Sequence, residues 1–338
     1  MALLALTLAL LAMTVATTAI TVIPLDMALN SFDDQYQDCG PAMKAELPAL
    51  NRSEFQKNSL FAKVWPMAVG MRKFGRYPQY PLSSSAHAIA IMAYTMIYLH
   101  KEFNDAVRVA GRSPQEYRDS FHFKTLHFLL TDALATLRDF QGRQCYCVFR
   151  GVDQYKFEAN VGDTVRFGQF ASSTLCENVI HDFGTTTVFK VITCHGAYIR
   201  NFSLYPGEEE VLIPPFEKFK VSKIIEGTQN VQIHLDSFGT YSRYNCEWLK
   251  GKSIPRAPAT SEDSSGPPQF RQRALGSSGP QSHQGHEDPC SHCGNHDHQD
   301  HQDSQRNKAT KTTKATTTTM AALATMASVW SLRSPLAL

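Results

Sequence analysis

Three adjacent glutamates, Glu208, Glu209 and Glu210, stand directly before the apolar run VLIPP at 211–215. In an extended segment the side chains of residues i and i+2 share a face, so this pattern predicts that Glu208 and Glu210 project together and Glu209 points away. Two carboxylates about 4 Å apart repel each other by roughly 4 kcal/mol at an effective dielectric constant of 20. A cation between them offsets that repulsion, so the pair is suited to bind a positively charged group.

Two more motifs lie upstream of the glutamates. Arg150 and Gly151 end the run VFRG at 148–151, and Ser172 belongs to the run FGQFASST at 167–174. The order arginine, serine, Glu-x-Glu resembles the signature of the arginine-specific mono-ADP-ribosyltransferases, which include vertebrate GPI-anchored ecto-enzymes and bacterial toxins. The surrounding segments, over about residues 24 to 250, also resemble the vertebrate enzymes. Ser-Ser-Thr stands here in place of a strict Ser-Thr-Ser, which preserves the hydroxyl groups.

The resemblance implies NAD-dependent transfer of a single ADP-ribose to arginine side chains of extracellular or cell-surface proteins, with release of nicotinamide. Cleaving the bond between nicotinamide and ribose develops oxocarbenium-like positive charge, which a fixed carboxylate stabilises. By resemblance, Glu210 is this catalytic group and hydrogen-bonds the ribose 2′-hydroxyl. Glu208 matches the acid that admits the arginine acceptor, since a carboxylate binds a guanidinium in bidentate fashion and helps to remove a proton. Glu209 is then a solvated bystander.

The upstream motifs are expected to hold NAD. By resemblance, Arg150 binds the diphosphate and ribose, because its fork of donors matches phosphate oxygens; a structural salt bridge is the alternative. Gly151 allows close backbone approach to the nicotinamide amide. Ser172 is expected to position the ribose and the catalytic glutamate. Phe183 is a candidate for stacking on nicotinamide, with core packing as an equal alternative.

Two other functions remain open beside the transferase. In an NAD glycohydrolase, water replaces arginine in the same site. In a catalytically inactive cell-surface binding protein the fold persists without the chemistry, although intact Arg150, Ser172, Glu208 and Glu210 argue against that.

Other site types lack their motifs. No Gly-x-Gly-x-x-Gly follows a predicted strand, and there is no Walker-type phosphate loop, zinc-protease motif or Gly-x-Ser-x-Gly elbow. The formal charge is +2 with scattered basic residues, so charge gives no case for nucleic acid. NAD as a substrate, without a metal, is therefore expected from the transferase signature alone.

The ends of the chain differ in composition from the middle. Residues 1–23 lack charge and are mostly apolar, which predicts a signal peptide cleaved between Ala16 and Ile23; a buried amino-terminal helix is the alternative. Residues 24–255 are expected to form the catalytic domain. Residues 256–319 are rich in Ser, Thr and His and read as a disordered stalk. Residues 320–338 resemble a GPI-attachment signal, which places the protein on the extracellular face of the plasma membrane, with secretion as the alternative.

An exported chain favours disulfide bonds among its eight cysteines. The resemblance implies the pairs Cys39 with Cys246 and Cys145 with Cys194. It leaves Cys147 and Cys176 unassigned: Cys147 could compete with Cys145 or pair with Cys176. In the tail, Cys290 and Cys293 lie near several histidines, which is compatible with an intermolecular disulfide or adventitious metal binding. Two glycosylation sequons begin at Asn51 and Asn201.

The elements that must position these groups change type along the chain. Ser113 and Glu116 form a capping box that predicts a helix start, and leucines at helical spacing predict a helix over 124–140. The apolar segment 88–98 is compatible with helix or strand. Short β-rich runs follow, at 145–149, 165–170, 185–194, 209–213, 219–225 and 231–235. We therefore expect an α+β fold in which a helical amino-terminal part packs on a mainly antiparallel two-sheet β core of the ADP-ribosyltransferase type.

Overall fold

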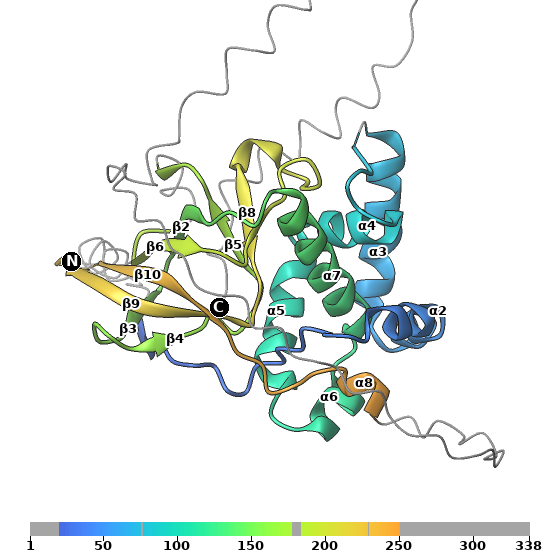
Figure 1. Ribbon diagram of the computed structural model, residues 1–338, viewed down its shortest axis with the longest axis horizontal. Coiled ribbons are helices and arrows are strands. Elements are labelled where there is room, and N and C mark those ends of the chain that lie inside the picture. The colour runs from blue at the N-terminus through green and yellow to red at the C-terminus, as the bar shows by residue number, and fades with distance from the viewer. Residues whose placement is uncertain (1–19, 76, 178–183, 229, 251–338) are drawn as a thin grey trace, which may run out of the picture.

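The computed structural model describes residues 20–75, 77–177, 184–228 and 230–250. Helices gather on one side of the molecule and strands on the other (Figure 1). The helices are α2 (Gly40–Lys57), α3 (Ser59–Phe74), α4 (Ser85–Tyr94), α5 (Leu99–Ala110), α6 (Pro114–Ser120), α7 (Lys124–Phe140) and the short α8 (Glu247–Lys250). Among these residues we find no helix with the length and apolar character needed to cross a membrane.

The strands form one large sheet and one small one. They are β1 (Thr21–Pro24), β2 (Tyr146–Val152), β3 (Tyr155–Glu158), β4 (Thr164–Val165), β5 (Ala171–Thr174), β6 (Thr187–Thr193), β7 (Ala197–Tyr198), β8 (Glu210–Ile213), β9 (Glu217–Glu226) and β10 (Val231–Thr240). The large sheet has the order β4-β9-β10-β6-β2-β5-β8-β7, and its neighbours are antiparallel except β10 and β6. Strands β1 and β3 pair in parallel. The expected α+β class with a mainly antiparallel β part is confirmed.

The junction between β2 and β5 divides the large sheet into two parts. Phe149 opposite Thr174 is the register pair between these strands, whereas β2 and β6 pair along their whole length from Tyr146 to Val152. Beyond Phe149 and Thr174, strands β2 and β5 separate. This separation leaves room at the carboxyl end of β2, beside the start of β5.

Strands β5 and β8 are buried on both faces. Leu212 of β8 belongs to the apolar cluster built with the helices, while Val211 and Ile213 belong to the cluster inside the β part. Phe170 and Ala171, at the start of β5, divide between the two clusters in the same way. Burial on both faces explains why the sequence after the glutamates is continuously apolar rather than alternating.

The predicted helices are confirmed. The Ser113 hydroxyl accepts a hydrogen bond from the Glu116 backbone at 3.0 Å and caps α6, and α7 spans the expected residues 124–140. The ambiguous segment 88–98 lies mostly in helix α4.

The predicted strand at 165–170 is wrong, because only Val165 of that segment lies in a strand. Strand β4 ends at Val165 and β5 begins at Ala171. Gly168 between them has a φ of +63°, and a Cβ there would lie 2.3 Å from the Cβ of Ala28. The chain therefore turns at Gly168, in a conformation that only glycine adopts at low cost.

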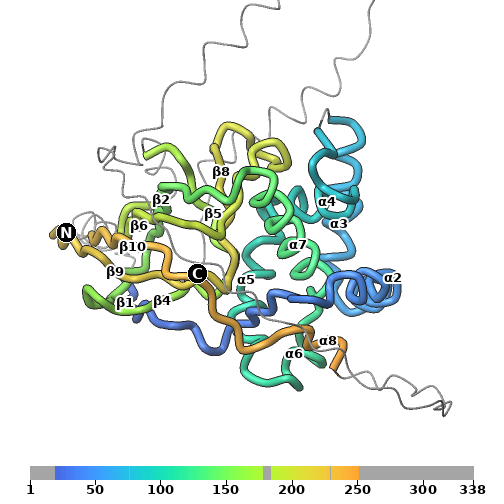
Figure 2. Tube along the Cα trace, viewed as in Figure 1, coloured from blue at the N-terminus to red at the C-terminus, as the bar shows by residue number. Residues whose placement is uncertain are grey.

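The two ends of the described domain lie side by side. In Figure 2 the blue segment before α2 and the orange segment before α8 run together beneath the sheet and helices. Asp33 accepts hydrogen bonds from the backbone of Arg243 and Tyr244, and Asp34 accepts from the backbone of Cys246 and Glu247. Segments about two hundred residues apart are thus joined by two buried carboxylates.

Candidate active site

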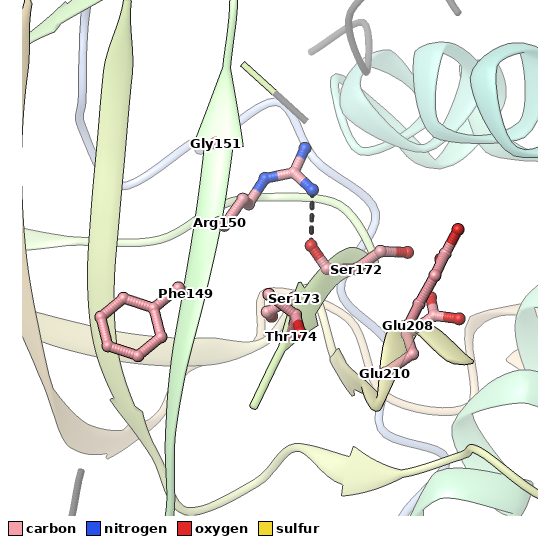
Figure 3. A pocket seen from close by; sticks show the side chains of 8 residues that line it. All are labelled: Phe149, Arg150, Gly151, Ser172, Ser173, Thr174, Glu208 and Glu210. Carbon is pink, nitrogen blue, oxygen red and sulfur yellow. Dashed lines mark hydrogen bonds between the residues drawn. The ribbon is translucent and has the colours of Figure 1, made fainter. Parts of the chain in front are cut away.

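A hollow of about 250 Å³ opens where β2 and β5 separate. Figure 3 shows its lining, which is contributed by β2, by β5 and by the turn into β8: Phe149, Arg150, Gly151, Ser172, Ser173, Thr174, Glu208 and Glu210. The structure thus brings together Arg150, Gly151, Ser172, Glu208 and Glu210, all of which the sequence singled out.

Arg150 connects the two strands across the opening. Its side chain is buried, and its Nη1 donates a hydrogen bond of 2.8 Å to the carbonyl oxygen of Ser172. Alternation along β2 sends the Phe149 ring to the opposite side of the strand (Figure 3). Burial lowers the pKa of Arg150 from its usual range, and the nearby Tyr94 and Glu210 act in the opposite direction. The fork of donors on this buried guanidinium is chemically suited to an anion.

Two helices fix the start of β5. The Tyr94 hydroxyl of α4 and the Asn104 amide of α5 each donate a hydrogen bond of 3.0 Å to the carbonyl oxygen of Phe170. Burial raises the pKa of Tyr94 to about 12, opposed by hydrogen bonds to Ser172 and Asn104. The helical half therefore sets the position of Ser172 through buried polar contacts. No motif marks Tyr94 or Asn104 for this role, because Tyr94 belongs to an apolar segment and Asn104 stands among the charged residues of α5.

The glutamates do not lie in one continuous strand, so the predicted reason for their common orientation is wrong. Glu208 ends a 3-10 turn over Pro206–Glu208, and Glu209 has left-handed backbone angles of φ 47° and ψ 49°. Strand β8 begins only at Glu210. Glu208 and Glu210 nevertheless both line the hollow, one on each side of the left-handed Glu209. Glu210 is 4% exposed, and Glu208 is half-buried.

Glu209 is not a solvated bystander. Its carboxylate accepts a hydrogen bond from the Tyr198 hydroxyl and forms an ion pair of 2.8 Å with Arg200. Burial raises the pKa of Tyr198 to about 12, and the contact with Glu209 adds to this effect. The backbone of Glu209 also accepts a hydrogen bond of 3.1 Å from Leu175. Glu209 therefore stabilises the turn that positions Glu208 and Glu210.

Ser203 contacts Glu210 directly. Its hydroxyl donates a hydrogen bond of 3.1 Å to Oε2 of Glu210, and the side chain is fully buried. The sequence offered one signal at this position, the sequon that starts at Asn201, and that signal pointed to glycosylation rather than to the site.

Comparison with known proteins agrees with this geometry. The family model described as NAD:arginine ADP-ribosyltransferase matches residues 25–243. The chain belongs to this family. An erythroblast NAD(P)+–arginine ADP-ribosyltransferase of Gallus gallus is 47% identical over 249 residues, covering 72% of this chain and 83% of the relative. A GPI-linked NAD(P)+–arginine ADP-ribosyltransferase of Homo sapiens is 45% identical over 261 residues, covering 72% and 79%.

Solved structures of the family support the fold as well. The crystal structure of the eukaryotic mono-ADP-ribosyltransferase ART2.2 superposes with a TM-score of 0.57 at 34% identity, covering 66% of this chain and 98% of that one. A variant of ART2.2 in complex with NAD gives the same TM-score, identity and coverage.

The sequence also made predictions about the cysteines and about Phe183. The disulfides Cys39–Cys246 and Cys145–Cys194 are present, as expected for this ADP-ribosyltransferase. Cys147 and Cys176 are also disulfide-bonded. Phe183, Cys290 and Cys293 lie outside the part of the chain that the structure describes. Within the described ranges no cluster of His, Cys, Asp and Glu has the geometry of a metal site.

Proposed function

We propose that this ADP-ribosyltransferase transfers a single ADP-ribose from NAD to arginine side chains of extracellular or cell-surface proteins and releases nicotinamide. The observation that carries the proposal is the convergence of Arg150, Ser172, Glu208 and Glu210 on one hollow. A buried cation and a buried carboxylate at opposite sides of one opening match the anionic diphosphate and the ribose that becomes cationic.

NAD, the substrate, fits the lining from both strands. Arg150 would bind the diphosphate and its ribose, and Gly151 presents no side chain to obstruct the nicotinamide amide. Ser172 would orient the nicotinamide ribose.

Glu210 has the burial that the bond-breaking step requires. As the bond from nicotinamide nitrogen to the ribose C1′ breaks, the bonding electrons leave with nicotinamide and positive charge develops on the ribose. A carboxylate held in a region shielded from water stabilises that charge more strongly than one exposed to it. Glu210 is the group of the pair that meets this condition.

Glu208 is placed to choose the acceptor. It is more exposed than Glu210 and lines the same hollow, so an arginine side chain of a second protein can reach it from solvent. Its carboxylate would bind the guanidinium and accept a proton as the guanidinium nitrogen attacks C1′. Without this group, water can still attack the same carbon.

The decisive assay uses labelled NAD and a small arginine analogue with the full chain expressed in animal cells. We expect wild type to label the analogue, and Glu210→Gln to lower both labelling and nicotinamide release by at least about a hundredfold, the loss typical of one removed electrostatic contact. Glu208→Gln should lose labelling while nicotinamide release continues. Free ADP-ribose without labelled analogue would indicate a glycohydrolase, and no turnover would leave an inactive binding protein.

The ends of the chain support export and anchorage at the cell surface. The described fold begins with β1 at Thr21, so we place signal-peptide cleavage in the part of the 16–23 window that precedes Thr21. The named human, mouse and rabbit relatives are GPI-linked, which supports the same attachment here through residues 320–338 after a stalk over 256–319. Release of the protein from intact cells by phosphatidylinositol-specific phospholipase C tests this; retention after treatment would contradict it.

The sequons differ in accessibility. Asn201 is exposed in the segment before the 3-10 turn, whereas Asn51 lies inside α2 and is half-buried. We therefore propose Asn201 as the glycosylated residue of the two. A glycan there projects from the surface while Ser203, two residues later, faces the interior.

A further inference from the structure

The segment between β7 and the 3-10 turn holds Glu210 at two points. The backbone nitrogen of Ile199 donates a hydrogen bond of 2.9 Å to the carbonyl oxygen of Glu210, and the Ser203 hydroxyl reaches the carboxylate of the same residue. The segment is itself fastened to the helical half, because the Leu204 backbone donates to the Thr95 hydroxyl at the end of α4. Main chain and side chain of Glu210 are thus restrained from one side.

The hydroxyl of Ser203 has a defined direction. Its oxygen accepts a hydrogen bond of 3.1 Å from the backbone nitrogen of Tyr205, so its own proton is available to Oε2 of Glu210. The side chain is fully buried, and the Ser203 backbone nitrogen donates to the carbonyl oxygen of Ile199. Because an ionised carboxylate only accepts hydrogen bonds, this hydroxyl is the donor toward it.

We propose that Ser203 is a positioning residue for Glu210, whose hydroxyl orients the carboxylate toward the nicotinamide ribose and favours its ionised form. This inference rests on the proposed function of Glu210 and adds to it a residue from outside the three sequence motifs. The general reason is that a hydrogen bond donated to a charged group is stronger than one between neutral groups, and it stabilises the charge that the reaction needs.

The same serine completes the sequon of Asn201, and the two roles conflict in the folded chain. Asn201 is exposed, but the Ser203 hydroxyl is enclosed and already engaged with Glu210 and Tyr205. A glycan would therefore be attached before this segment folds. Replacing Ser203 alone removes both the hydroxyl and the sequon, so a test must separate the two effects.

A matched pair of variants separates them. Asn201→Gln removes the sequon and keeps the hydroxyl, and Asn201→Gln with Ser203→Ala removes both on the same unglycosylated background. The full chain is expressed in animal cells, and kcat and KM for NAD are measured for nicotinamide release across pH 5 to 9. Thermal unfolding of both variants confirms that each is folded.

We expect the double variant to lose about 10- to 100-fold in kcat relative to Asn201→Gln, the range of a lost hydrogen bond to a charged group. The KM for NAD should change much less. The acidic limb of the kcat profile should move to higher pH by about one unit, because the ionised carboxylate has lost a donor.

Equal kcat values in the two variants would overturn the inference while leaving the proposed function intact. A loss of kcat without movement of the acidic limb would also overturn it, since packing damage lowers the rate without changing the titration of Glu210. Absence of turnover in wild type and Asn201→Gln alike would reject the proposed function, and this inference with it.

Discussion

His127 is a single residue whose protonation state is set by the fold. Its Nδ1 lies 2.8 Å from the Tyr36 hydroxyl and its Nε2 lies 3.2 Å from the Phe32 carbonyl oxygen, with no exposed surface. Burial lowers the pKa of His127 to about 3, only partly opposed by the Phe32 contact. These contacts and the complete burial of the ring are those of a packing residue.

A pH dependence of stability follows from His127. The folded state holds the ring neutral while the unfolded chain binds a proton below about pH 6.5, so this contribution is complete above pH 6.5 and is lost as the pH falls toward 3. Between pH 6.5 and pH 5 the loss should be about 2 kcal/mol. In urea titrations at pH 7 and pH 5, the His127→Asn variant should be less stable than wild type at pH 7 and should lose less stability on acidification. His122→Asn should change the slope less, because partial burial and the nearby Lys124 and Lys57 lower the pKa of His122 by a smaller amount.

The residues of the site were predictable in kind but not in arrangement. The order of Arg150, Ser172 and the glutamates along the chain identified these groups, because that order resembles the signature of a known transferase family. The left-handed backbone of Glu209 has no sequence signal, since glycine or asparagine would be expected there. Ser203 approaches Glu210 through a turn whose course depends on tertiary contacts, so no local sequence pattern predicts its role.

Arg166 explains why the strand predicted at 165–170 does not form. Within the segment predicted as a strand, this buried side chain forms an ion pair of 2.7 Å with Asp33 and donates to the carbonyl oxygens of Met27, Ala28 and Tyr241. Partners so distant in sequence leave no local pattern. Helices with local caps and periodicity were predictable. The loop around Arg166 was not, because a long-range ion pair determines its course.

The Asp33–Arg166 ion pair joins the amino-terminal segment to the β part, so breaking it should lower the free energy of unfolding. Asp33→Asn leaves a guanidinium without its counter-charge in a site with no exposed surface, and should lower the free energy of unfolding by about 3–5 kcal/mol. Asp139→Asn, which removes an exposed pair with Arg143, should change it by less than about 1 kcal/mol. Chemical denaturation of both variants at pH 7 compares them; similar small losses would show that the buried pair does not hold the segment.

For the molecule as a whole, the disulfide bonds differ in how much chain they enclose. Cys39–Cys246 spans 207 residues and Cys145–Cys194 spans 49. Chain entropy predicts that Ser substitution of both cysteines costs about 5 kcal/mol for the long loop and about 4 kcal/mol for the short one. Unfolding of the two double variants in guanidinium chloride should show the larger loss for the first. The opposite order would mean that local packing, rather than loop length, decides.

The position of Cys246 also has a mechanical consequence. Lys250, four residues later, is the last residue that the structure describes, and the chain continues from there toward the proposed anchor. A pulling force transmitted along that tail, for example while a bound partner on another surface moves away, first meets the covalent bond to Cys39. Strands β9 and β10 cannot then be peeled from the carboxyl end one after another. The load passes instead to Cys39, at the start of α2.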